Sequence, residues 1–191
     1  MNVILASQSP RRRELLGLFH IPFTVRVADV DETLVPGAPA FDEVARLSRL
    51  KAQAVERQAD DVGIAADTIV VCDGRILGKP HDPEEAKEML RLLSGRDHQV
   101  MSGMTVLRGE NATTVTEVTD LHFRELSEKE IDEYVASGES MDKAGAYGIQ
   151  GGAALFCRRM EGDYYNVVGL PVCRLAEILR ELAPELMGET V

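Results

Sequence analysis

Short apolar runs alternate with longer amphipathic stretches along this chain, which is the pattern of an α/β protein. In the first half of the chain the pattern predicts strands near residues 2–6, 23–28 and 63–72. It predicts helices near residues 10–19 and over 41–59, the second with Val44, Leu47 and Leu50 on one side. Asp73-Gly74 is a hairpin signal and predicts a short returning strand over 75–77.

The second half continues the alternation. Asp82 and Pro83 predict the start of a helix that ends near residues 94–95, and Ser127 with Glu130 predicts a capped helix to about residue 137. Between them, two β-rich stretches over 99–108 and 113–124 predict an antiparallel pair. Residues 164–168 resemble a last strand, and residues 171–182 a closing helix.

Length and charge narrow the classes of protein and partner. A chain of 191 residues can hold one domain, or two small lobes sharing a sheet, and it contains neither a repeat nor a flexible linker. The formal charge of -11 argues against broad binding of nucleic acid or an anionic membrane. A small phosphate ligand remains possible because it needs only a local basic pocket.

The chain carries no sign of a membrane or secreted protein. No apolar run approaches the length of a membrane span, and Met1-Asn2 leads into a strand without a basic leader, so we expect a cytoplasmic location. The three cysteines are far apart and form no C-x-x-C pair. The four histidines lack metal-ligand spacing.

The segment from Ser7 to Arg13 predicts an anion site. Ser9 and Pro10 are suited to cap and begin a helix, which places Arg11 and Arg12 in its first turn. Unpaired N–H groups and the positive end of the helix dipole favour a phosphate there. The positive arginines are unfavourable at this positive end unless an anion neutralises both. The alternative is a solvated basic patch.

Three carboxylates follow or interrupt predicted strands. Asp67 lies within the apolar run 64–71, where a charge is costly unless it is paired, binds a metal or faces a cleft. An aspartate that accepts backbone hydrogen bonds at a strand edge is an equal alternative. Asp31 and Glu32 follow another strand, where simple exposure is the stronger alternative. Together the three can hold Mg²⁺ or Mn²⁺.

Two lysines and one amide complete the chemistry that the residues suggest. Lys51 on the long helix and Lys79 in the tight Gly78-Lys79-Pro80 loop are possible phosphate cations, although a lone lysine is usually only solvated. Gln150 lies in a glycine-rich loop and offers a donor and an acceptor to a nucleobase edge. That loop matches neither G-x-G-x-x-G nor a P-loop.

Taken together, these segments resemble the Maf family of nucleoside triphosphate pyrophosphatases over nearly the whole chain. The motifs that carry the resemblance are LASQSPRRRELL (5–16), VDET (30–33), RLSRLKA (46–52), AADTIV (65–70), GKP (78–80), LSGRDHQV (93–100), KAGAYGIQG (143–151) and NVVGLP (166–171).

The resemblance implies a cytoplasmic enzyme that depends on a divalent metal (Mg²⁺, Mn²⁺ or Co²⁺) and splits a nucleoside triphosphate between the α and β phosphates. It makes Asp67 the proton acceptor, and the family's specificity positions fall on Arg11, Thr68 and Gln150, as in the branch acting on dTTP and UTP. It also implies a homodimer and a fold like that of inosine triphosphate pyrophosphatases. That fold is a long mixed twisted sheet with helices on its faces and two lobes around a cleft.

Combining both interpretations, Ser7, Arg11, Arg12, Lys51 and Lys79 would bind the triphosphate, and Glu32 with Asp67 would hold the metal. Arg13 has no assigned role, because successive helical residues point about 100° apart. Three other functions remain open: a 7-methyl-GTP pyrophosphatase, a non-catalytic nucleotide-binding regulator of cell division, and a nucleotidyltransferase. Relatives also differ in nucleotide breadth, including modified pyrimidines.

Overall fold

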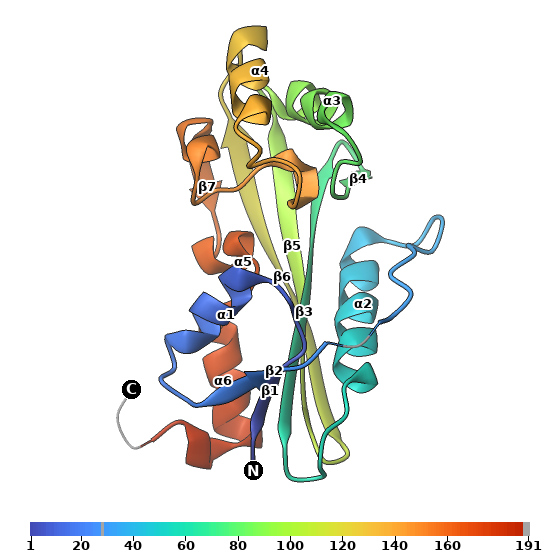
Figure 1. Ribbon diagram of the computed structural model, residues 1–191, viewed down its shortest axis with the longest axis vertical. Coiled ribbons are helices and arrows are strands. Elements are labelled where there is room, and N and C mark those ends of the chain that lie inside the picture. The colour runs from blue at the N-terminus through green and yellow to red at the C-terminus, as the bar shows by residue number, and fades with distance from the viewer. Residues whose placement is uncertain (28, 189–191) are drawn as a thin grey trace. The chain divides into compact units, whose positions relative to one another are not determined.

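The structure, a computed structural model, describes residues 1–27 and 29–188 (Figure 1). Its strands form a sheet with the order β2-β1-β3-β5-β6-β7, and β4 pairs with β3. The strands are β1 (Val3–Leu5), β2 (Phe23–Val25), β3 (Val62–Cys72), β4 (Arg75–Leu77), β5 (Asp97–Arg108), β6 (Asn111–Phe123) and β7 (Cys157–Glu161).

Six α-helices and three short 3₁₀ helices are assigned within the described residues. The α-helices are α1 (Pro10–Gly17), α2 (Ala40–Ala54), α3 (Pro83–Leu93), α4 (Glu128–Ala136), α5 (Tyr164–Val168) and α6 (Val172–Leu182). The 3₁₀ helices are η1 (Ala144–Ala146), η2 (Gly152–Leu155) and η3 (Pro184–Leu186).

The chain divides into two compact units, and β3, β5 and β6 contribute residues to both. Unit 1 contains residues 1–67, 102–117 and 169–191, and unit 2 contains residues 68–101 and 118–168. Each unit therefore consists of segments that are far apart in the sequence.

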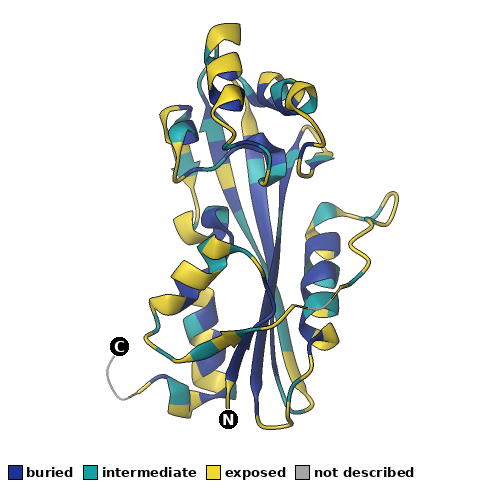
Figure 2. Ribbon diagram, in the orientation of Figure 1, coloured by how far each residue is buried: buried dark blue, intermediate teal, exposed yellow. Residues whose placement is uncertain are grey.

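In unit 1, β1 runs parallel to both β2 and β3. Helices α1 and α6 lie on one side of these strands and α2 on the other (Figure 1). A cluster of buried apolar residues joins β1, α2, β3 and β5, and its members are Ile4, Ala6, Ala52, Val55, Ala65 and Leu107. Figure 2 shows the buried residues of α2 and of these strands in dark blue. This core fixes α2 against β3.

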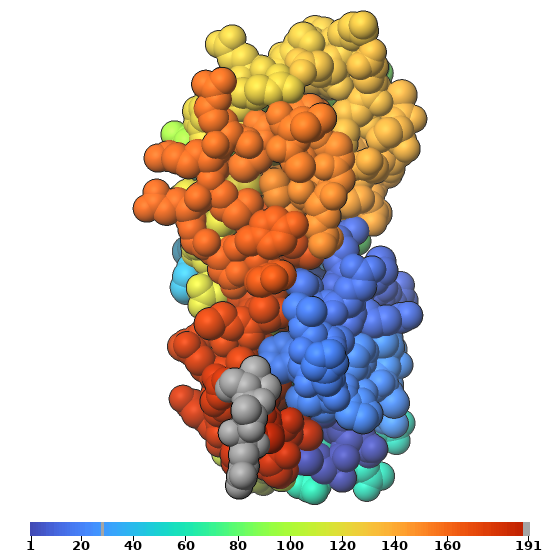
Figure 3. Space-filling view, turned by 90° about the vertical axis from the view of Figure 1, so that its left-hand side faces the viewer, coloured from blue at the N-terminus to red at the C-terminus, as the bar shows by residue number. Residues whose placement is uncertain are grey.

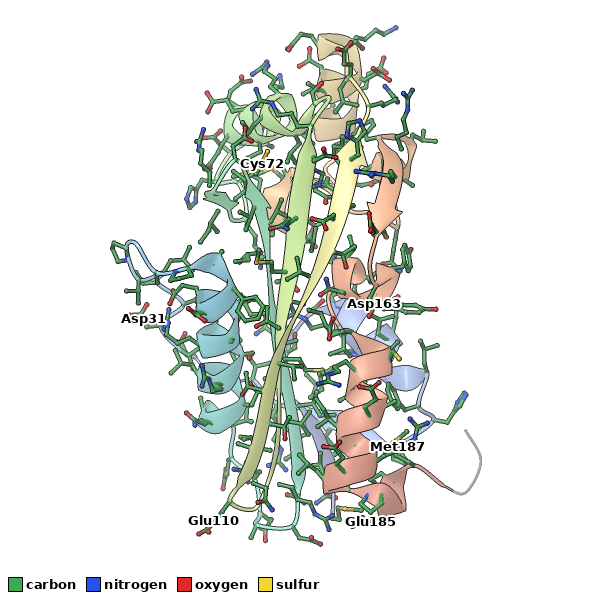
Figure 4. All side chains as sticks on the ribbon, turned by 180° about the vertical axis from the view of Figure 1, so that it is seen from behind. Asp31, Cys72, Glu110, Asp163, Glu185 and Met187 are labelled. Carbon is green, nitrogen blue, oxygen red and sulfur yellow. The ribbon has the colours of Figure 1, made fainter. Side chains whose placement is uncertain are left out.

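In unit 2, β3 and β4 form a tight antiparallel hairpin in which Cys72, labelled in Figure 4, pairs with Arg75. Asp73 and Gly74 between them have φ angles of 49° and 74°. Positive φ at both central residues is what a two-residue hairpin turn of this kind requires. Helix α3 packs against α4 and against η1.

Most of the predicted elements are confirmed, because their signals are local. Ser9 caps α1 by accepting a hydrogen bond from the N–H of Arg12, and Asp82 caps α3 in the same way. Ser127 and Glu130 form the predicted capping box of α4. The 99–108 and 113–124 stretches are β5 and β6, joined at a turn that contains Glu110 (Figure 4). The predicted α/β class with a mixed sheet is also confirmed.

The strand predicted over residues 164–168 is wrong, because this segment is the helix α5. Asp163, labelled in Figure 4, accepts a hydrogen bond from the N–H of Tyr165 through its carboxylate and another from the N–H of Val167 through its carbonyl. These bonds start a helical turn. The last strand is instead β7, which the sequence analysis did not predict.

Some element boundaries also differ from the prediction, most clearly those of α2 and β2. Helix α2 ends at Ala54 rather than near residue 59, since Val55 is extended with a ψ angle of 134°. The chain then turns, and the Asp61 carboxylate accepts hydrogen bonds from the N–H groups of Gln58 and Asn2. Strand β2 ends at Val25, and residue 28 of the predicted strand lies outside the described residues. In the described part of the chain, no helix combines the length and the apolar character that a bilayer crossing needs.

Candidate functional site

Helix α2 lies directly on β5 in unit 1. A Cβ atom at Gly103 of β5 would lie 2.2 Å from the carbonyl oxygen of Val44, so only glycine permits this approach. Next to this contact, the buried hydroxyls of Ser48 and Thr105 form a hydrogen bond of 2.8 Å. The contacts fix the height and rotation of α2, and therefore the position of Lys51 on its last turn.

Lys51 joins two of the predicted site carboxylates. Ala65 and Asp67 are two residues apart on β3 and share the face that meets α2. The Nζ atom of Lys51 lies 2.5 Å from Oδ1 of Asp67 and 2.8 Å from Oε2 of Glu32. Asp67 is only 9% exposed, so the ammonium compensates a carboxylate that the middle of a strand would otherwise exclude.

The loop that carries Glu32 is held against α2 by a second ion pair. The carboxylate of Glu43 accepts two hydrogen bonds of 2.8 Å from the Arg46 guanidinium and one of 2.8 Å from the N–H of Val35. Arg46 also donates to the carbonyl of Thr33 at 2.9 Å. Hydrogen bonds from Arg46 and Val35 lower the pKa of the buried Glu43 to about 2, so this carboxylate is ionised near neutral pH. The loop is therefore fixed to α2 directly after Glu32, at Thr33 and Val35.

Asp31 takes part in the same loop rather than in the carboxylate pair. Its Oδ1 accepts a hydrogen bond of 2.9 Å from the N–H of Thr33. Hydrogen bonding to the side chain and backbone of Thr33 lowers the pKa of Asp31. Figure 4 shows Asp31 in the loop beside α2. Its exposed carboxylate shapes the local turn.

The predicted anion segment lies at the start of α1. The guanidinium of Arg12 donates to the carbonyl of Gly169 at 2.8 Å and to the hydroxyl of Ser7 at 3.3 Å. Figure 3 shows the C-terminal residues of unit 1 (red) bordering its N-terminal residues (blue). The Arg12 guanidinium is thus anchored between the chain's first and last segments.

The charges of Asp67 and Glu32 act on Arg12. Burial lowers the pKa of Arg12, and the charge of neighbouring Arg11 lowers it further, whereas Asp67 and Glu32 raise it. The guanidinium stays protonated at neutral pH because its ordinary pKa is so high. Arg11 and Arg12 are half-buried, and Arg13 is exposed.

The other predicted residues, Thr68, Lys79 and Gln150, belong to unit 2. Thr68 is half-buried on β3, and Lys79 and Gln150 are exposed. We call residues 143–152 the Gln150 loop. Its Gly145 donates its N–H to the carbonyl of Gly78 at 3.0 Å, and a Cβ at Gly145 would lie 2.9 Å from the Val70 side chain. The segments that carry the three residues therefore meet at Gly145.

The carboxylates of unit 1 suit a magnesium-like ion that completes its coordination with other oxygens. Among the described residues, no group of three or more His, Cys, Asp or Glu side chains is placed to enclose a metal. Glu32 and Asp67 nevertheless share one cationic centre, the Lys51 ammonium. Magnesium usually binds through one or two carboxylates, with waters and substrate phosphates as its other ligands.

The residues that hold the others in place were not predicted from the sequence. Glu43 and Arg46 are three residues apart on one helix, a spacing that allows an ion pair, but a solvent-exposed pair has the same spacing. The Gly169 carbonyl that anchors Arg12 has no side-chain signal at all. Such contacts depend on tertiary packing.

Comparisons with known proteins agree with the motifs. A family model described as Maf-like protein matches residues 2–182. A Bacillus cereus protein is 49% identical over 180 residues, covering 94% of each chain, and a Bacillus cytotoxicus protein is 50% identical over 179 residues, covering 93% of this chain and 94% of its own. Both are named dTTP/UTP pyrophosphatase.

The fold has a solved counterpart at low sequence identity. The structure of a HAM1 protein from Coxiella burnetii aligns with 95% of this chain and 99% of its own, with a TM-score of 0.50 and 14% identity. At that identity the likeness concerns the fold alone.

Proposed function

The chain belongs to the Maf family, and we propose that it hydrolyses dTTP and UTP between the α and β phosphates. The products are the nucleoside monophosphate and pyrophosphate. The relatives named for this activity align with nearly the whole chain, which supports the assignment. The structural observation that carries it is the shared cationic centre of Glu32 and Asp67, whose charges also act on the anchored Arg12.

We propose that Glu32 and Asp67 hold the divalent cation, which is Mg²⁺, Mn²⁺ or Co²⁺. Their convergence on the Lys51 ammonium supports this, because both carboxylates already face one positive centre. When bound, the cation supplies neutralisation of phosphate oxygens and a more acidic bound water.

Attack of water on the α-phosphorus requires positioning and charge stabilisation more than a covalent nucleophile. Asp67 is the base that accepts the proton of this water. Lys51 exchanges its carboxylate partners for a phosphate oxygen once their charge is compensated. The residues that bind the triphosphate are Ser7, Arg11, Arg12, Lys51 and Lys79.

Selection of the nucleobase is assigned to Arg11, Thr68 and Gln150. The contacts of Gly145 support a joint role for Thr68, Lys79 and Gln150, since their segments meet there. We further propose that residues 1–191 act as one Maf-like domain of two lobes sharing a sheet, as a homodimer in the cytoplasm. The family resemblance supports the choice of base-selecting residues, the single domain and the cytoplasmic homodimer.

Three other functions predict different products. A 7-methyl-GTP pyrophosphatase would prefer a methylated purine, and Arg11, Thr68 and Gln150 at the family's specificity positions disfavour it. A nucleotidyltransferase would conserve the nucleotide in a sugar product. A regulator of cell division would bind nucleotide without releasing pyrophosphate.

The test is hydrolysis of UTP, dTTP, 7-methyl-GTP and modified pyrimidine nucleotides in water enriched in ¹⁸O, with Mg²⁺, Mn²⁺ and Co²⁺ compared. We expect UTP and dTTP to give the monophosphate and pyrophosphate, with the label in the monophosphate because water attacks the α-phosphorus. Label in pyrophosphate would contradict the point of attack. A preference for 7-methyl-GTP, or an absence of pyrophosphate, would contradict the proposed function.

A further inference from the structure

Two side-chain hydrogen bonds bracket Gln150 within unit 2. The N–H of Gly148, two residues before Gln150, donates to the hydroxyl of Tyr134 at 3.0 Å. The N–H of Gly152, two residues after it, donates to Oε2 of Glu139 at 3.0 Å. The backbone on both sides of Gln150 is thus attached to one helix, α4, and to the segment that follows it.

The loop lies directly on these two side chains. A Cβ atom at Gly151 would lie 2.1 Å from Oε2 of Glu139, so the carboxylate occupies the space that a side chain at residue 151 would need. A Cβ at Gly152 would lie 3.3 Å from the ring of Tyr134. Glycine at both positions therefore permits the close approach of Glu139 and Tyr134 to the backbone.

Further contacts hold the rest of the Gln150 loop. The hydroxyl of Tyr147 and Nε2 of His98 form a buried hydrogen bond of 2.8 Å. At the start of the loop, the Lys143 ammonium donates to the Glu139 carbonyl at 2.6 Å. Tyr147 and Ile149 are buried whereas Gln150 is exposed, so the loop presents its amide from a fixed backbone.

An amide selects a nucleobase only if its orientation is fixed. The ring edge of uracil or thymine presents an N–H donor between two carbonyl acceptors, whereas cytosine presents an amino donor and a ring-nitrogen acceptor. A glutamine amide that turns over can serve either pattern, because it has one acceptor side and one donor side. Discrimination therefore depends on the backbone from which the glutamine extends.

We propose that Tyr134 and Glu139 are positioning residues for base selection, which hold the backbone on both sides of Gln150 so that its amide accepts from and donates to a uracil edge. The proposal rests on the proposed function, since it assumes that Gln150 faces the base. Neither residue touches the nucleotide. Both act through the backbone N–H groups of the loop.

The test compares kcat/KM for UTP and CTP in the wild type and in the variants Tyr134→Phe, Glu139→Ala, Glu139→Gln and Gln150→Ala. Tyr134→Phe removes the hydroxyl acceptor and keeps the ring that packs against Phe156. We expect Tyr134→Phe and Glu139→Ala each to reduce the preference for UTP by about fivefold to tenfold, the effect of one lost hydrogen bond. Glu139→Gln keeps an acceptor oxygen and should retain most of the preference.

A matched control is Glu128→Gln, which lies on α4 like Tyr134 and loses a surface ion pair with Arg91 of α3. It should leave the preference unchanged. Calorimetric binding of uridine and cytidine nucleotide analogues that resist hydrolysis gives the same ratio independently of turnover. A purely structural role would change stability and overall activity but not this ratio.

The outcomes separate the inference from the function beneath it. If Gln150→Ala removes the preference while Tyr134→Phe and Glu139→Ala keep the wild-type ratio, the inference is wrong and the assignment of Gln150 stands. If Gln150→Ala also keeps the ratio, the assignment of Gln150 and the inference both fail. Should Tyr134→Phe not fold, the Glu139→Ala and Glu139→Gln pair decides the question alone.

Discussion

The ammonium of Lys51, on helix α2, lies 2.5 Å from a carboxylate oxygen of Asp67, which is on the next element, strand β3. Each side chain is less than one sixth exposed, at 15% and 12%. A charge in the middle of a buried strand is tolerated because its partner comes from the next layer.

Replacing Lys51 with methionine should destabilise the protein, because Asp67 would be left buried beside Glu32 without the ammonium that contacts both carboxylates. We expect the free energy of unfolding to fall by about 2 kcal/mol, below the usual range for a fully buried pair because both side chains retain some exposure. Urea unfolding without added metal measures this change.

The double variant Lys51→Met with Asp67→Asn is the control for that measurement. Since the buried charge is also removed, it should lose less stability than the two single variants summed, with a coupling of about 1 kcal/mol or more. Strict additivity would mean that the ion pair contributes nothing to the fold.

The Glu43–Arg46 pair should control metal affinity through the loop that carries Glu32. Glu43→Gln or Arg46→Leu frees one side of this loop, so we expect the dissociation constant for Mn²⁺ to rise about tenfold, as for other groups that orient metal ligands. Paramagnetic titration of bound Mn²⁺ measures the affinity directly.

A second helical ion pair with the same spacing serves as a control. Arg174 and Glu177 lie three residues apart on α6, and Glu177→Gln should leave Mn²⁺ affinity at the wild-type value. Equal Mn²⁺ affinity in Glu43→Gln and in the control would show that the Glu43–Arg46 pair does not affect metal binding.

His98 should make the protein less stable in mild acid. Burial lowers the pKa of His98 to about 4 from 6.5, with nearby Asp97 opposing the shift and His122 adding to it. Because the folded-state pKa is the lower one, the neutral imidazole stabilises the fold above about pH 6.5, and this contribution is lost as the pH falls towards 4. We expect a loss of about 2 kcal/mol between pH 7 and pH 4.5.

Urea unfolding of the wild type and His98→Gln at both pH values isolates this contribution, because carboxylates titrate equally in the two proteins. The difference in stability between them should shrink in acid. A constant difference would show that His98 does not titrate in this range.

The sequence alone could predict the features that depend on neighbouring residues. Ser9 and Asp82 identify helix starts, and Asp73-Gly74 identifies a hairpin, because each acts within a few residues. Asp67 could be recognised as an unusual charge, but its partner could not. Lys51 reaches Asp67 because Gly103 allows α2 to approach β5, which is a tertiary contact.

The last strand could not be predicted from the sequence. Residues 164–168 are too few for helical and strand periods to be separated, and the hydrogen bonds of Asp163 decide the outcome. Strand β7 lies at the edge of the sheet and contains the exposed Arg158 and Arg159, so it lacks the apolar alternation that would reveal it. The contacts that hold the Gln150 loop could not be predicted either, since Tyr134 and Glu139 accept hydrogen bonds from backbone N–H groups.

The most direct test of the central claim is the turnover of Asp67→Asn with UTP. Asparagine keeps the shape of the side chain but cannot accept a proton from water, so kcat should fall by at least about 100-fold, the lower end of general-base contributions. The dissociation constant for a UTP analogue that resists hydrolysis should stay within a few fold of the wild type. Pyrophosphate release by Asp67→Asn at close to the wild-type rate would show that Asp67 is not the base.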